Sequence, residues 1–156
     1  MASEWLEFYR GTAADSEGRR LTEILSWDDE LLENVHDYIQ WLFPLPERSA
    51  FNPHAPLLTA EDIAAARSEA DVQSNLRAAF ARMMRFYGLT AETAHLPKPW
   101  VCAGDHNHLR FTRILRSLSL LGLRDEAQLL YDGISQFNET FPARTKQFWR
   151  DAMEGE

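Results

Sequence analysis

Apolar residues recurring at the period of an α-helix constrain the fold of this 156-residue chain more than any other feature. The longest such segment covers residues 71–87, where apolar side chains return every three or four residues and Gly88 follows as a helix-ending residue. No window alternates apolar and polar residues with period two, which is the pattern of a half-buried strand. We therefore predict an all-α fold without a sheet, formed by about seven helices in a single compact domain over residues 1–156.

A second strongly periodic segment covers residues 105–122. The side chains expected to face inward from it are Phe111, Ile114, Leu115, Leu118 and Leu121. The remaining helices are expected over residues 5–9, 21–27, 60–67, 127–141 and 142–153. Thr59 followed by Asp62 predicts a capped start for the helix at residues 60–67.

Residues 28–44 are predicted to form one further helix. Acidic residues at its start suit the positive end of the helix dipole, and Pro44 ends it. Its apolar stripe consists of Leu31, Val35, Tyr38 and Leu42. Two proline-containing loops follow later in the chain: residues 44–56, expected to be anchored by Phe51, Leu57 and Leu58, and residues 89–104, expected to be anchored by Trp100.

Composition excludes several classes of partner. The formal net charge of −8 argues against nucleic acid or an anionic membrane as the main partner, because both attract a positive surface. No apolar stretch approaches the ~20 residues that a membrane span needs. The single cysteine, Cys102, cannot form an internal disulfide, and the N-terminus has no signal-peptide pattern. We expect a cytoplasmic monomer or homo-oligomer.

Five runs of residues, in order over about residues 8–123, carry a family resemblance. They are Phe8–Gly11, Leu32-Glu33 with His36–Pro44, Phe51-Asn52 with Ala55–Leu57, Met84–Gly88 and His106–Leu118. The most specific are the nonapeptide His36–Pro44 (HDYIQWLFP) and the run His-Asn-x-Leu-Arg that begins at His106. Together they resemble the conserved domain of the opioid growth factor receptor family.

The resemblance implies an α-helical domain and, as in the animal members, binding of enkephalin-type opioid peptides with a growth-regulating role. Those members look nuclear or membrane-associated, and they carry C-terminal repeats and basic localisation signals that these 156 residues lack. The chain is therefore expected to be a minimal, stand-alone member. Its partner is expected to be a peptide or a small anionic ligand.

Two segments carry the candidate ligand-binding residues, and we predict a groove between the helices at residues 36–44 and 106–121. Arg110 and Arg113 are three positions apart, and His106 lies one turn before Arg110, so the three share a helix face. Guanidinium groups suit a carboxylate or phosphate. The predicted ligand-binding set is His36, Gln40, Trp41, His106, Asn107, Arg110 and Arg113.

Each candidate has a structural alternative. His36 lies at the border of polar and apolar faces, where a histidine can bind a ligand or instead satisfy a backbone carbonyl. The arginines can bind a ligand or instead pair with acidic residues of another helix. The acidic residues considered are Asp28, Asp29, Glu30 and Glu33.

Cys102, His106 and His108 follow a C-x3-H-x-H pattern that could suggest a metal site. Residues two apart in a helix point about 200° away from each other, so the histidines converge only if the helix begins after them. We predict no metal and no cofactor. No familiar catalytic motif occurs, so no enzyme activity is expected. The alternatives are a small enzyme on an anionic substrate, with His36 or His106 as acid or base, and a structural adaptor without a ligand.

Overall fold

The computed structural model describes residues 2–50 and 52–154. Within these residues the fold is all-α, and the only bridge between extended segments is an isolated one joining Leu45 and Leu57. The prediction of an all-α fold without a sheet is therefore confirmed. None of the described helices is long and apolar enough to cross a membrane.

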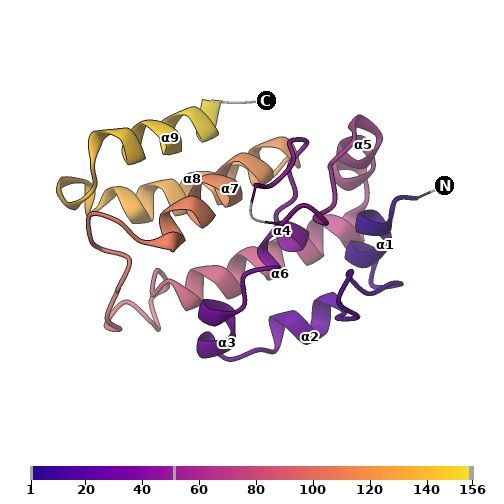
Figure 1. Ribbon diagram of the computed structural model, residues 1–156, viewed down its shortest axis with the longest axis horizontal. Helices are drawn as coiled ribbons and strands as arrows, with labels where there is room; N and C mark the ends of the chain where they lie inside the picture. Colours follow the sequence, from indigo (N-terminus) through magenta and orange to yellow (C-terminus); the bar gives the residue numbers. More distant parts are fainter. Residues whose placement is uncertain (1, 51, 155–156) are drawn as a thin grey trace. The chain divides into compact units, whose positions relative to one another are not determined.

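The described residues form nine α-helices and one short 3-10 helix (Figure 1). In chain order they are α1 (Glu4–Arg10), α2 (Leu21–Leu25), α3 (Asp29–Asn34), α4 (Ile39–Leu42), α5 (Ala60–Ser68), α6 (Ala70–Phe86), α7 (His106–Leu120), α8 (Arg124–Ser135), η1 (Asn138–Thr140) and α9 (Ala143–Glu154). They divide into two compact units, Met1–Arg82 and Met83–Glu156, and the boundary falls within α6. The single domain over residues 1–156 stays a prediction.

The helix ends expected from the sequence are present. Gly11 has a φ of 83°, and its N–H donates to the Phe8 carbonyl at 3.1 Å. Gly88 has a φ of 74° after α6. These backbone conformations favour glycine because it has no Cβ atom. At the start of α5, Thr59 and Asp62 form a reciprocal capping box, as predicted.

The single helix predicted over residues 28–44 is wrong, because residues 35–38 interrupt it between α3 and α4. Val35 is extended, with φ −89° and ψ 130°. Valine, histidine, aspartate and tyrosine each have a helix propensity roughly 0.5–0.7 kcal/mol poorer than alanine. In addition, the Tyr38 hydroxyl donates to the Leu32 carbonyl at 2.6 Å, which a continuous helix would pair with the N–H of His36. The apolar residues therefore keep the spacing of a helix across residues 35–38, although these residues are not helical.

In the first unit, α1 is bound to α4 through its aromatic side chains. The Trp5 indole N–H donates to the Trp41 carbonyl at 2.9 Å, and the Tyr9 hydroxyl donates to the Leu42 carbonyl at 2.7 Å. Phe8 packs edge-on against the Trp41 ring, with a centroid distance of 5.3 Å. All five side chains are buried. The nonapeptide that carries the family resemblance thus supplies much of the core of this unit.

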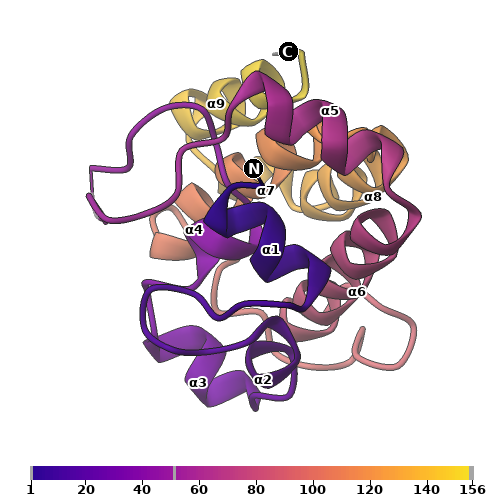
Figure 2. The same cartoon turned by 90° about the vertical axis from the view of Figure 1, so that its right-hand side faces the viewer.

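A long loop joins α4 to α5 in the first unit (Figure 2). Its ends meet where the Leu58 N–H donates to the Leu45 carbonyl at 3.0 Å. Leu58 is buried, which confirms its predicted anchoring role. Leu57 is 46% exposed, so its predicted role is wrong, because the bridge to Leu45 turns neighbouring side chains in opposite directions. Phe51 lies outside the described residues.

Burial raises the pKa of the Tyr9 phenol well above its ordinary value of about 10. An unfolded chain ionises this phenol near pH 10, while the folded chain keeps its proton. The contribution of Tyr9 to the free energy of unfolding should therefore be fully present below about pH 10. Above this pH it should decrease, by up to ~1.4 kcal/mol per pH unit. Urea unfolding at several alkaline pH values should show that the free energy of unfolding decreases less steeply with pH in Tyr9→Phe than in the wild-type chain. An identical pH dependence in both proteins would contradict this assignment.

In the second unit, α7 packs against both α8 and α9 (Figure 1). All five residues predicted to face inward from residues 105–122 are completely buried. Trp100 anchors the preceding loop as predicted, because its indole N–H donates to the Tyr87 carbonyl at 3.1 Å. The Trp149 indole N–H donates to the His108 carbonyl at 3.1 Å, which joins α9 to the start of α7. Phe141 lies against the Trp149 ring, with a centroid distance of 4.9 Å.

Candidate functional site

The structure places three predicted ligand-binding residues in the first unit. His36 is exposed in the break between α3 and α4. Gln40 and Trp41 belong to α4 and are 6% and 2% exposed. The Gln40 side-chain oxygen accepts a hydrogen bond from the Asn52 amide at 3.3 Å, so Gln40 holds the loop between α4 and α5. His36 and Gln40 therefore lie on different elements rather than on one helix face.

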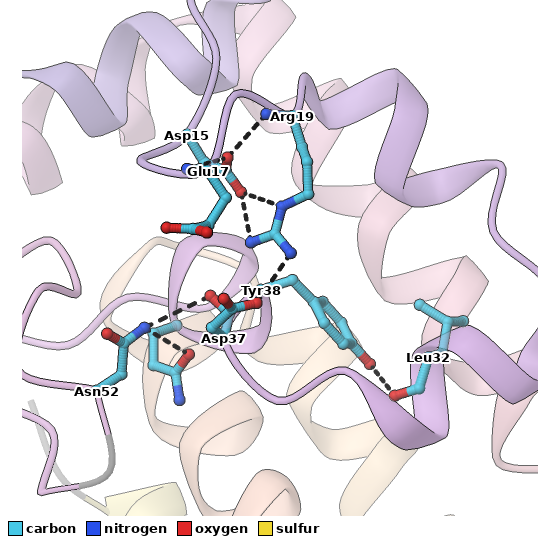
Figure 3. A network of polar contacts seen from close by, with 8 residues as sticks. Asp15, Glu17, Arg19, Leu32, Asp37, Tyr38 and Asn52 are labelled. Carbon is cyan, nitrogen blue, oxygen red and sulfur yellow. Dashed lines mark hydrogen bonds and ion pairs between the residues drawn. The ribbon is translucent and has the colours of Figure 1, made fainter.

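The break that carries His36 is fixed by an ionic network that sequence reasoning missed (Figure 3). The Asp15 side chain is completely buried and accepts hydrogen bonds from the N–H groups of Glu17 and Arg19, each at 2.9 Å. Arg19 also binds Asp15 through Nε and Nη2, both at 2.8 Å, and reaches Asp37 with Nη1 at 2.8 Å. We call this network the Asp15–Arg19–Asp37 clasp. Its signal in the sequence is only a polar turn around Gly18.

The charge of Arg19 is stabilised inside the clasp. Burial lowers the pKa of its guanidinium, but the hydrogen bonds to Asp15 and Asp37 outweigh burial, so the pKa is raised overall. The guanidinium also lies over the Trp27 ring, 5.4 Å from its centroid. Trp27 in turn packs edge-on against Tyr38. Arg19 is therefore held on several sides and stays charged.

The other four predicted residues lie on α7 in the second unit. Asp105 caps this helix by accepting the Asn107 N–H at 2.8 Å, so the helix begins at His106. His106, Arg110 and Arg113 consequently follow each other by four and three positions and share one face. The Arg110 guanidinium is buried and donates to the Asn107 side-chain oxygen at 3.4 Å.

The charge of α7 is one-sided. The helix contains three arginines, at positions 110, 113 and 116, and no aspartate or glutamate. The His106 side chain is 41% exposed, Arg113 is half-buried and Arg110 is 5% exposed. A ligand carboxylate or phosphate near this face would meet guanidinium donors without a competing acidic group on the same helix.

Two of the acidic residues considered as partners for these arginines have partners within the first unit. Asp28 accepts the Leu31 N–H at 2.9 Å and so caps the start of α3. Asp29 pairs with Arg82 at 2.8 Å, and Arg82 also donates to the Trp27 carbonyl. Arg82 was not singled out by the sequence pattern, because its pairing spans more than fifty positions.

The cysteine and the two histidines of the C-x3-H-x-H pattern do not point toward one common position. Because α7 begins at His106, the two histidines point in different directions. His108 is buried and places Nε2 2.7 Å from the Trp100 carbonyl. Cys102 donates its thiol to the Gly104 carbonyl at 3.3 Å. Among residues 2–50 and 52–154, no group of three histidine, cysteine, aspartate or glutamate side chains is placed to hold a metal ion.

The candidate residues therefore form two sets. Residues His106, Asn107, Arg110 and Arg113 come together on eight consecutive positions of α7. Gln40 and Trp41 are buried in α4, whereas His36 is exposed outside it. The groove between the two segments stays a prediction.

Comparisons with known proteins agree with the resemblance. The family model described as "Opioid growth factor receptor (OGFr) conserved region" matches residues 2–136. The opioid growth factor receptor of Mus musculus is 38% identical over 135 residues, which cover 76% of this chain and 21% of that protein. The human receptor is 38% identical over 133 residues, covering 76% and 20%. Opioid growth factor receptor-like protein 1 of Xenopus tropicalis is 35% identical over 119 residues, covering 68% and 23%.

This chain thus spans about a fifth of the length of the curated relatives that it matches. No solved structure matches it. The match to the family model covers most of the chain and includes α1 to α8. The chain belongs to the opioid growth factor receptor conserved-region family.

Proposed function

We propose that this chain is a binding module for a short peptide or another small anionic ligand, and that α7 supplies the main contact. The observation that carries the proposal is the face of α7 shared by His106, Arg110 and Arg113, on a helix without any acidic residue. The names of the relatives describe receptors of a growth factor, which supports a ligand-binding role. We propose no catalytic role for these residues.

The proposed ligand group is a carboxylate, such as the C-terminus of a peptide. Arg113 is half-buried and would donate to the carboxylate from the planar guanidinium group. Arg110 is buried beside Asn107 and would add positive potential with little loss of side-chain freedom. His106 would border the site at the exposed first turn of α7.

The proposal predicts a specific loss of affinity on replacing Arg113. We expect Tyr-Gly-Gly-Phe-Met to cause saturable NMR amide shifts on α7 in the wild-type chain. The variant Arg113→Gln should bind the peptide about 10- to 100-fold more weakly, because a hydrogen bond to a charged group contributes ~1.5–3 kcal/mol. The control is Arg124→Gln, which removes an exposed arginine from the start of α8 and should leave the affinity unchanged.

The outcomes separate binding from a purely structural role. Urea unfolding of Arg113→Gln and Arg124→Gln measures whether either substitution changes stability. If Arg113→Gln loses stability and binds as the wild type does, Arg113 serves packing. The absence of any shift at millimolar peptide, or equal weakening by Arg124→Gln, would contradict the proposed function.

A further inference from the structure

The break between α3 and α4 is not dictated by a helix-breaking residue. Residues 29–43 contain neither glycine nor proline. The apolar positions 31, 35, 38 and 42 also keep the period of a helix through the break. The apolar pattern is therefore compatible with one continuous helix, and contacts made by other parts of the first unit favour the broken form together with local ones.

One contact within the segment and two contacts from outside it lie at the break. Within the segment, the Tyr38 hydroxyl donates to the Leu32 carbonyl at 2.6 Å, the carbonyl that would accept the His36 N–H in a continuous helix. The Asp37 carboxylate is held by Arg19 at 2.8 Å. The Asn52 amide lies 3.5 Å from the Asp37 carbonyl. Arg19 and Asn52 thus hold Asp37 by its side chain and its backbone.

The Asp15–Arg19–Asp37 clasp has a fixed half and a detachable half. The Asp15 side chain is fully buried and the Arg19 side chain is 13% exposed, whereas the Asp37 side chain is 47% exposed. Arg19 also makes two contacts to Asp15 and lies over the Trp27 ring, so Asp37 is only one of the groups that hold it. A half-exposed ion pair is the weaker of the two, because water competes for it.

We propose that the Asp15–Arg19–Asp37 clasp is a conformational lock on the segment from α3 to α4. When the clasp is closed, residues 35–38 stay out of the helix. When Asp37 is released, residues 29–42 shift toward a continuous helix. In that helix His36 and Gln40 would be one turn apart on the same face, whereas in the closed form His36 is exposed and Gln40 is buried in α4. The lock thus decides whether these two side chains share a face.

The test compares two clasp variants with a matched control in the full chain. Asp37→Asn weakens the detachable half, and because asparagine and aspartate have similar helix propensities, a change reports the lost ion pair. Arg19→Lys keeps the charge but cannot bind both carboxylates with a fork of N–H groups. The control is Arg20→Lys, which alters the exposed neighbour that donates to the Gly11 carbonyl.

Backbone NMR assignment gives the 13Cα secondary shifts of residues 35–38. We expect them to move toward helical values in Asp37→Asn and Arg19→Lys, and to stay unchanged in Arg20→Lys. A clasp that only stabilises the fold would lower the melting temperature and leave these shifts as they are, which would overturn the proposal. A move toward coil values would overturn it as well. If Arg19→Lys does not fold, Asp37→Asn decides, because it leaves the Asp15–Arg19 pair intact.

Discussion

Replacing Trp149 by alanine should lower the free energy of unfolding by about 3–5 kcal/mol. Trp149 is 1% exposed and packs against Phe111 and Phe141. Its indole N–H donates to the His108 carbonyl at 3.1 Å, so the substitution also removes a buried hydrogen bond, although the Thr112 hydroxyl still donates to this carbonyl at 3.2 Å. The loss combines a large cavity with one lost hydrogen bond.

Phe148→Ala is the matched control for this prediction. Phe148 precedes Trp149 on α9 and is 45% exposed, so removing its ring should change stability by less than about 1 kcal/mol. Urea unfolding of the two variants measures the difference. Equal stabilities would contradict the packing described for α9. A large difference would show that α9, which lies beyond the matched residues 2–136, is required for the fold of the second unit.

Replacing Trp41 by alanine should also cost about 3–5 kcal/mol. Trp41 is 2% exposed, contacts Phe8 and offers its carbonyl to Trp5. Its own indole Nε1 has no hydrogen-bond partner among the described residues. Trp41→Phe should therefore lose ring volume without losing a hydrogen bond.

Trp5→Phe provides the comparison, because the two indoles are equally buried but only Trp5 donates a hydrogen bond. We expect Trp5→Phe to be more destabilising than Trp41→Phe by about 1 kcal/mol in urea unfolding. If Trp41→Ala keeps the wild-type stability and reduces only peptide affinity, the core role of Trp41 is wrong. The ligand contact predicted from the sequence would then describe Trp41 better.

Much of the fold could be predicted from local sequence, for a physical reason. The apolar residues of α7 recur at the period of a helix, so its buried face could be predicted from this segment alone, without knowing which elements pack against it. Gly11 and Gly88 mark helix ends because their backbone conformation favours glycine. The break between α3 and α4 was missed, because Arg19 and Asn52, distant in sequence, hold Asp37.

The candidate site shows the same limit. The shared face of His106, Arg110 and Arg113 follows from helical spacing once the helix is known to begin at His106. The environment of Gln40 could not be predicted from helical spacing, because its partner is Asn52, which lies twelve positions later in a loop. Asp15 and Arg19 gave no signal beyond a polar turn, and their importance comes from burial. Spacing along the chain thus shows shared helix faces but not contacts between segments.

The central claim is that this domain binds a ligand carboxylate through α7. The most direct test of this claim is isothermal titration calorimetry of the wild-type chain with two forms of Tyr-Gly-Gly-Phe-Met. One form is the free acid and the other is the C-terminal amide. The account predicts that the free acid binds at least about tenfold more tightly, because only it offers a charged acceptor to Arg113. Equal affinities for the two peptides, or no binding of the free acid, would contradict the account.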